Sequence, residues 1–305
     1  ITLFFEFPAQ IRQAAGGKPR KRRASVYFAY GLPVSVSLVF EHLLSAGDRF
    51  LIAGFLDEAA VGIYAAGYGL ADRTIDILFI WLGAAATPLM IRALERDGEA
   101  AVREVAGQSA RVMGLLGFPA AAGLALVATP LATVMVGADF RDGAATILPW
   151  IAVAGLMNGL MTYYFHEAFI LRRKTRWMAG IMAAAALFNL ALNIVLLPLF
   201  GIAGAAAATL IAYTAGLVAC ALVGHQLFPL PLPWLDWTKA LAATAGMALA
   251  VILLPVSGPA FLVLLAKSAI GFVAYAGLAV AMNIAGCRSW IGIAQGWLRP
   301  SEAVT

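Results

Sequence analysis

Charged side chains lie inside two apolar segments in the first third of the chain, and these residues are the most able to do chemistry. A charged group at the depth of the hydrocarbon costs a few kcal/mol, so it normally faces a protein interior or a water-filled cavity. Such charges can bind ions, carry protons or pair with one another. They are Glu41, Asp48, Arg49, Asp72, Arg73 and Asp76.

The spacing of these charges predicts how they meet. If the chain reverses near Ala59, Arg49 lies about 15 Å before the turn and Asp72 about 20 Å after it, at the helical rise. The two helices would run antiparallel, so Arg49 is expected to pair with Asp72, and Asp48 with Arg73. Two interpretations stay open: a salt bridge that locks two helices together, or the polar wall of a transport pathway.

The composition indicates an integral membrane protein. Hydrophobic residues make up 62% of the 305 residues and charged residues 12%, with a mean hydropathy of +0.88. Ordinary soluble domains are about a quarter charged. The two cysteines, Cys220 and Cys287, have no metal-ligand spacing, so neither a disulfide framework nor a metal site is expected. No cofactor is expected either.

The elements that position the charges are long apolar runs rich in Ala, Leu and Gly. Most have about the 20 residues that a membrane-spanning helix needs, and none shows the alternation of a strand. The sequence therefore predicts an all-α membrane protein with about eight spans. They are 24–56, 60–91, 112–136, 144–171, 177–199, 202–224, 239–256 and 260–284.

Basic residues concentrate in alternate connections between these segments. Lys18–Arg23 and Arg172–Arg176 are dense basic runs, whereas the turns at Asp57-Glu58 and Phe200-Gly201 carry no Lys or Arg. Because cytoplasmic loops carry an excess of Lys and Arg, both ends of this chain are expected in the cytoplasm. The same placement explains the basic pI near 9.4 without a nucleic-acid partner. The segment 290–298 is expected to lie along the inner membrane interface.

Three stretches resemble a known family in order and spacing. Gly31–Leu56 carries an Asp-Arg pair, Gly62–Met90 begins G-x-Y-x-x-x-Y and ends near a Pro, and Leu187–Tyr213 contains N-x-x-x-N followed by GIAGAAAAT. They are similar to helices of polysaccharide flippases. The chain thus resembles the superfamily of multidrug and oligosaccharidyl-lipid exporters.

This resemblance implies a domain organisation. The family has two bundles of six helices around a central cavity, often with two extra helices. Residues 24–224 would be the second bundle, and 225–305 the extra pair with an interfacial tail. Residues 1–23 would be the end of a preceding helix and a basic loop between bundles. The first bundle is expected upstream of Ile1 on the same full-length chain.

The resemblance also implies a substrate, a polyprenyl-diphosphate-linked oligosaccharide moved from the cytoplasmic to the outer leaflet of the inner membrane. The pathway would be surface polysaccharide synthesis, such as lipopolysaccharide or exopolysaccharide. Cationic groups suit a diphosphate, so Arg49, Arg73 and Lys267 are the expected binding residues. Four carboxylates are expected to hold the arginines or to carry a coupling proton or cation: Glu41, Asp48, Asp72 and Asp76.

Two other functions remain as alternatives. A cation-coupled antiporter for drugs or small solutes would use the carboxylates alone. A membrane-embedded glycosyl- or acyltransferase would need a catalytic constellation, but the histidines His42, His166 and His225 lie in separate elements. We therefore expect a transporter rather than an enzyme, with no catalytic residue.

Other polar residues are expected to have structural roles. Asn189 and Asn193 share a helix face and are expected to hydrogen bond to a neighbouring helix. His166 and Glu167 precede a basic loop and are expected near the inner headgroups.

Overall fold

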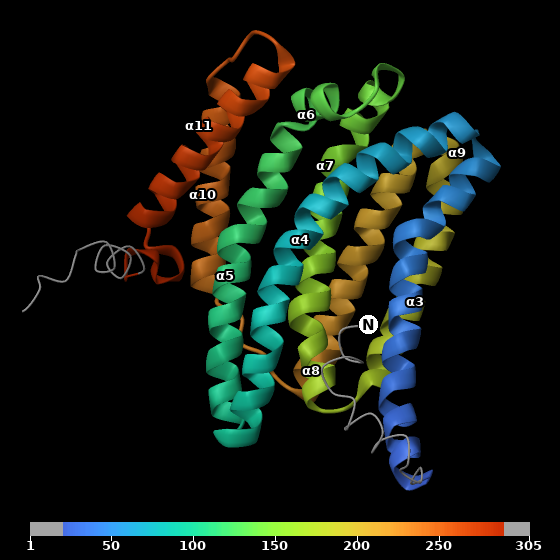
Figure 1. Cartoon of the computed structure of the whole chain (residues 1–305), viewed down its shortest axis with the longest axis vertical. Coiled ribbons are helices and arrows are strands. Elements are labelled where there is room, and N and C mark those ends of the chain that lie inside the picture. The colour runs from blue at the N-terminus through green and yellow to red at the C-terminus, as the bar shows by residue number, and fades with distance from the viewer. Residues whose placement is uncertain (1–20, 290–305) are drawn as a thin grey trace, which may run out of the picture.

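The chain is a bundle of long helices in the computed structural model, which describes residues 21–289, and this part of the chain contains no strand (Figure 1). The expected helix tail, most of the basic loop and the interfacial segment 290–298 lie outside the described residues. The main helices are α3 (Lys21–Phe55), α4 (Glu58–Arg96), α5 (Glu99–Leu126), α6 (Ala128–Met135), α7 (Arg141–Leu160), α8 (His166–Leu171), α9 (Thr175–Leu227), α10 (Trp234–Leu253) and α11 (Ala260–Ala281). A 3-10 turn, Ala138–Phe140, precedes α7, a π turn, Met161–Phe165, joins α7 to α8, and a 3-10 turn, Ile284–Gly286, follows α11.

The helices confirm the predicted class of multi-pass membrane protein. Within residues 21–289, six helical segments are long and apolar enough to cross a membrane. One of them, Thr175–Leu227, has 53 residues, about twice the length that a single crossing needs. Helix α3 is not among the six. The number of eight crossings therefore stays a prediction.

The reversal between α3 and α4 lies about three residues before the predicted position near Ala59. α3 ends at Phe55 and α4 begins at Glu58. The side chain of Asp57 accepts a hydrogen bond of 2.7 Å from the backbone N–H of Ala60, which satisfies one of the free donors at the start of a helix. Glu58 adds a negative charge to the first turn, where the helix dipole favours it.

Helix α9 turns back on itself at Gly201, between the predicted segments 177–199 and 202–224. Gly201 has φ 58° and ψ −144°, a backbone conformation that side chains disfavour. Beyond the turn, the backbone at Gly204 passes so close to Leu196 that an added Cβ would lie 2.2 Å from its carbonyl oxygen. The two halves of α9 therefore form a tight antiparallel hairpin.

The helices are packed in an order that differs from their order in the chain. α3 packs mainly on α9, while α4 packs on α7 and α5. α10 and α11 form a pair beside α5, at the opposite side of the molecule from α3 (Figure 1). Two polar contacts connect α10 to α5: an ion pair of 3.1 Å between Asp236 and Arg111, and a 2.8 Å hydrogen bond from Trp237 to the Ala110 carbonyl.

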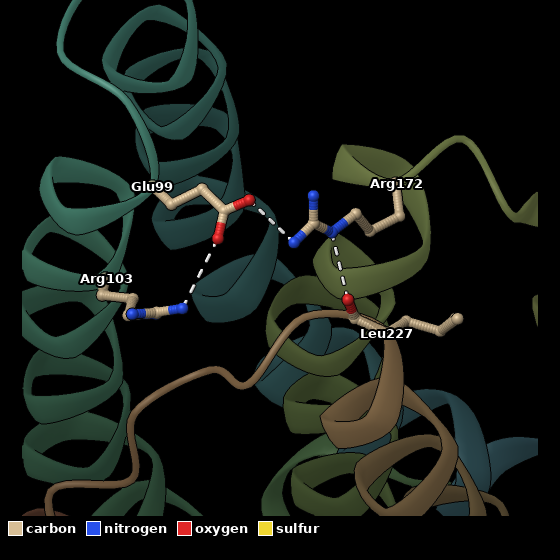
Figure 2. A network of polar contacts seen from close by, with 4 residues as sticks. All are labelled: Glu99, Arg103, Arg172 and Leu227. Carbon is tan, nitrogen blue, oxygen red and sulfur yellow. Dashed lines mark hydrogen bonds and ion pairs between the residues drawn. The ribbon is translucent and has the colours of Figure 1, made fainter.

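A polar network joins three connections at the end of the molecule opposite the α3–α4 turn (Figure 2). Glu99, at the start of α5, pairs with Arg172 at 2.7 Å and contacts Arg103 at 3.5 Å. Arg172 also donates a 3.0 Å hydrogen bond to the Leu227 carbonyl. Its guanidinium and that of Arg103 lie 5.2 and 5.7 Å from the ring centre of Phe228. The network therefore places two basic connections at one end.

Removal of Arg172 is expected to destabilise the protein more than removal of its partner Glu99. The ion pair is exposed, at 41% for each side chain, and such pairs contribute about 0.2–1 kcal/mol. Arg172 also donates a hydrogen bond to the Leu227 carbonyl and contacts the Phe228 ring. Arg172→Ala should therefore lower the free energy of unfolding by about 1–2 kcal/mol. Thermal unfolding of both single variants and the double variant in detergent measures this difference. Equal losses in the two single variants would contradict it.

Candidate functional site

A buried carboxylate, Asp48, forms the centre of a polar cluster between α3, α4 and both halves of α9. Its exposed fraction is 0%. Oδ2 accepts hydrogen bonds from the hydroxyls of Tyr64 and Thr209, at 2.7 and 2.6 Å. Oδ1 accepts a 2.9 Å bond from the amide of Asn193, which also lies 3.2 Å from Oδ1 of Asn189. We call these five residues the Asp48 node.

The Asp48 node has the chemistry of a site for a proton or a small cation. The side chains around the carboxylate are uncharged, and no Lys or Arg of the described residues lies within ion-pair distance of it. Two further polar atoms in the node, Nδ2 of Asn189 and Oδ1 of Asn193, are buried and have no hydrogen-bond partner among residues 21–289. Carboxylates in such surroundings mark proton and ion pathways in membrane proteins.

A second group, the carboxylate cluster, consists of Glu41, Asp72 and Asp76. These side chains are half-buried, and each lies within electrostatic range of the others. Glu41 accepts a 3.2 Å hydrogen bond from Thr162, and Asp76 accepts a 3.3 Å bond from Tyr163. Both donors belong to the π turn Met161–Phe165, an uncommon element that often occurs at functional sites.

The predicted ion pairs between α3 and α4 are wrong. Neither Arg49 with Asp72 nor Asp48 with Arg73 is within ion-pair distance in the described part of the chain. Asp72 lies only within longer electrostatic range of the two arginines. The interpretation as a direct salt bridge that locks the two helices together is therefore not supported.

The reason is a shift in where the two helices face each other. The chain reverses at about residue 56, so Asp48 meets Tyr64 across the turn, and Glu41 lies opposite Asp72. Asp48 is thus about eight residues, or roughly 12 Å, closer to the turn than Asp72. Farther from the turn, α3 and α4 diverge, and α3 packs mainly on α9 (Figure 1).

The three predicted cationic residues lie in different surroundings. The guanidinium of Arg49 lies 5.5 Å from the ring centre of Tyr68, and its buried Nε has no hydrogen-bond partner among the residues that the structure describes. Arg73 is exposed on α4. Lys267 of α11 lines a separate pocket of about 360 Å³ beside α10, together with Leu126 and Pro255. The structure therefore places Arg49 within longer electrostatic range of Asp72 and leaves Lys267 apart from the carboxylates.

Sequence reasoning missed several residues of these clusters. Tyr64 and Thr209 lie in the motifs G-x-Y-x-x-x-Y and GIAGAAAAT, so the motifs contained a signal for them. Thr162 and Tyr163 lie in the π turn, for which the sequence gives no sign. The prediction that Asn193 hydrogen bonds to another helix is confirmed by its bond to Asp48.

Comparison with known proteins gives two findings. Residues 9–145 match a family described as polysaccharide biosynthesis protein. The structure matches a solved "Lipid II flippase MurJ, inward closed conformation", with a TM-score of 0.72 and 15% sequence identity over 95% of this chain. The predicted flippase-family resemblance is confirmed. At this identity the structural match shows the fold alone, which is similar to that of the solved flippase.

Both matches cover only part of the proteins compared. The chain covers 60% of the length of the MurJ structure. The family match ends at residue 145, so it covers α3 to α6 and the start of α7, including the predicted site residues on α3 and α4. No curated protein sequence matches the chain.

Proposed function

We propose that the full-length protein is a flippase that moves a polyprenyl-diphosphate-linked oligosaccharide from the cytoplasmic to the outer leaflet by alternating access. The observation that carries this proposal is the fold, which matches that of a solved lipid II flippase over 95% of the chain. The family match to polysaccharide biosynthesis proteins supports the oligosaccharide part. The pathway would be synthesis of a surface polysaccharide such as lipopolysaccharide or exopolysaccharide.

Arg49 is the residue best placed to bind the diphosphate. A guanidinium matches the planar, bidentate geometry of phosphate oxygens. Its buried Nε has no partner in the described residues, so it has a free donor for a ligand. Arg73 is exposed on the same pair of helices and would add a second positive charge. Lys267 would act on the part of the substrate near α10 and α11.

The placement of basic residues supports the proposed orientation of the chain in the membrane. The ion pair between Glu99 and Arg172 puts the basic connections α4–α5 and α8–α9 at the same end. By the distribution of Lys and Arg, that end would be cytoplasmic, in an inner membrane with both chain ends inside. Residues 24–224 would be the second bundle and 225–305 the extra pair and tail, with the first bundle elsewhere on the full-length chain.

Transport against a gradient needs an energy source, and the Asp48 node supplies a site for one. Asp48 contacts α4 and both halves of α9, so binding of a proton or a monovalent cation there would change the fit of three helical segments. The carboxylate cluster lies farther from the α3–α4 turn than the Asp48 node. When no substrate is bound, its negative charges would hold the Arg49 guanidinium in position.

The carboxylate cluster also favours a second candidate function, a cation-coupled antiporter for cationic drugs. Glu41, Asp72 and Asp76 have no ion-pair partner within residues 21–289, and three carboxylates attract a cationic substrate. Arg49 and Arg73 would weaken that attraction. The Arg49 and Glu41 variants described below distinguish the flippase from the antiporter.

Replacement of Arg49 tests the flippase proposal. Arg49→Ala in the full-length protein is expected to lower surface polysaccharide about 10- to 100-fold, because hydrogen bonds to charged groups contribute about 1.5–3 kcal/mol. Arg49→Lys should retain part of the activity, and Arg73→Ala should have a smaller effect. Surface polysaccharide and membrane abundance are measured together.

The matched control is Arg96→Ala, an exposed arginine in the last turn of α4, which should leave polysaccharide unchanged. Full polysaccharide at normal abundance for every Arg49 variant would remove this residue from substrate binding. Unchanged polysaccharide with a higher sensitivity to cationic drugs in Glu41→Gln would instead support the antiporter.

A further inference from the structure

A second pair of buried titratable side chains lies at the opposite end of the bundle from the Asp48 node. His166 and Glu167 begin α8, directly after the π turn, and they are 5% and 3% exposed. The sequence predicts that they lie near the inner headgroups, which stays a prediction, and the structure buries both between helices. Thr87 of α4 and Gly224 in the second half of α9 contact this part of the chain.

Only one of the two carboxyl oxygens of Glu167 forms a hydrogen bond within the described residues. Thr87 of α4 donates a 2.6 Å hydrogen bond to Oε1. Oε2 is buried and has no hydrogen-bond partner in the described part of the chain, and the same holds for Nε2 of His166. On the other side, the backbone of α9 at Gly224 lies so close that an added Cβ would be 3.2 Å from Cβ of Ala168. There is no space for α9 to supply a larger side chain.

No charge compensates the Glu167 carboxyl. The titratable groups on the elements packed here include His166 beside it, Tyr163 and Tyr164 in the π turn, Cys220 and His225 in α9, and Arg92 in α4. Tyr164 donates its hydroxyl to the Pro231 carbonyl. In the described residues, Glu167 forms no ion pair, and the one group that acts on it appreciably is the Thr87 hydroxyl. An ionised carboxylate buried in this way without a cation costs several kcal/mol.

We propose that Glu167 is a second proton-binding site, which holds a proton on Oε2 in this conformation and releases it to water when α4 and α8 separate. Thr87 is the positioning residue, since it links the carboxyl to α4. The proton leaves Oε2 to a water molecule, and the carboxylate that remains is hydrated in the open conformation. The protein would then carry protonatable carboxyls at both ends of α4, joined to it by Tyr64 at one end and by Thr87 at the other.

The two sites differ in what a proton does there. At the Asp48 node, three hydrogen bonds hold the carboxyl in the closed hairpin of α9. At Glu167 a single hydrogen bond joins α4 to α8. An ionised carboxylate would accept this bond more strongly, but its charge would be buried without a cation, so hydration of the charge would favour separation of the two elements. Loss of the proton at Glu167 would therefore favour an opening of this end of the bundle. This consequence does not depend on which substrate the protein moves.

Infrared spectroscopy of the full-length protein in lipid tests the proposal, because a protonated carboxyl has its own C=O stretching band. Spectra of wild type and Glu167→Gln are compared between about pH 5 and about pH 9. The expected result is a carboxyl band that Glu167→Gln lacks and that wild type loses as the pH rises. Thr87→Val should shift the frequency of this band, and Thr87→Ser should restore it. Glu95→Gln, an exposed carboxyl on α4, should leave the band unchanged.

Two results would overturn the proposal. The absence of a Glu167 band at every pH would mean that the carboxyl is always ionised. A band that persists unchanged across the whole range would mean a permanently protonated structural acid. If Glu167→Gln does not fold, the frequency shift in Thr87→Val decides between the same outcomes, since the band must move when its hydrogen bond is removed.

Discussion

Asp48→Ala is expected to abolish transport and to lower the amount of folded protein. The carboxylate accepts hydrogen bonds from Tyr64, Thr209 and Asn193. Its removal leaves these donors buried without an acceptor, at about 1–3 kcal/mol for each unpaired group. Because the donors come from α4 and from both halves of α9, the loss also loosens the hairpin. Membrane abundance and transport are measured on the full-length protein.

Asp48→Asn separates coupling from folding. The amide keeps the shape of the carboxyl and one acceptor oxygen, so abundance is expected to stay near normal. It cannot bind a proton or attract a cation, so transport driven by an ion gradient should fall at least about tenfold, as expected for the loss of a charge-assisted interaction. Asp139→Asn, an exposed aspartate before α7, is the matched control. Normal gradient-driven transport by Asp48→Asn would contradict a coupling role for Asp48.

Gly204→Ala is expected to prevent correct folding. An added Cβ would lie 2.2 Å from the Leu196 carbonyl oxygen and 2.7 Å from its carbon. These are backbone atoms, which cannot rotate aside as a side chain does, so the hairpin at Gly201 would have to open. Overpacking of this kind typically costs about 1–3 kcal/mol and more where the backbone is rigid. Thermal unfolding and the yield of monodisperse protein in detergent measure the effect.

The same helix provides a control for this substitution. Gly180→Ala lies in the first half of α9, and an added Cβ there meets no atom within 4 Å. This variant should behave as wild type, because alanine is favourable in a helix. Opening of the hairpin would also separate Asn193 and Thr209 from Asp48, so Gly204→Ala should lose transport as well. Normal yield and unfolding temperature for Gly204→Ala would contradict the close approach of the two halves of α9 at this position.

The sequence predicts the class, the apolar segments and several turns of this protein because these follow from composition and local chemistry. The turn at Asp57 depends on a short capping side chain, and the break in α9 depends on a glycine with positive φ. Each of these signals is local, because it depends on only a few neighbouring residues. The number of membrane crossings and the division into bundles stay predictions.

The contacts between helices were less predictable, as the α3–α4 charges illustrate. A difference of about three residues in the position of the reversal moves each side chain to another partner, so Asp48 meets Tyr64 instead of Arg73. The packing of α3 on α9 depends on distant segments that periodicity does not identify. The donors Thr162 and Tyr163 reach Glu41 and Asp76 from a π turn, which arises from packing rather than from a local sequence signal.

The measurement that tests the central claim most directly is transbilayer movement of the lipid in vesicles. The full-length protein is reconstituted with a polyprenyl-diphosphate-linked oligosaccharide, and the fraction of sugar that an impermeant lectin reaches is followed over time. We expect this fraction to change with time for the wild type, and to remain at the level of protein-free vesicles for Arg49→Ala. No movement by a folded wild type, in vesicles where the same protein transports a cationic dye, would contradict the flippase function.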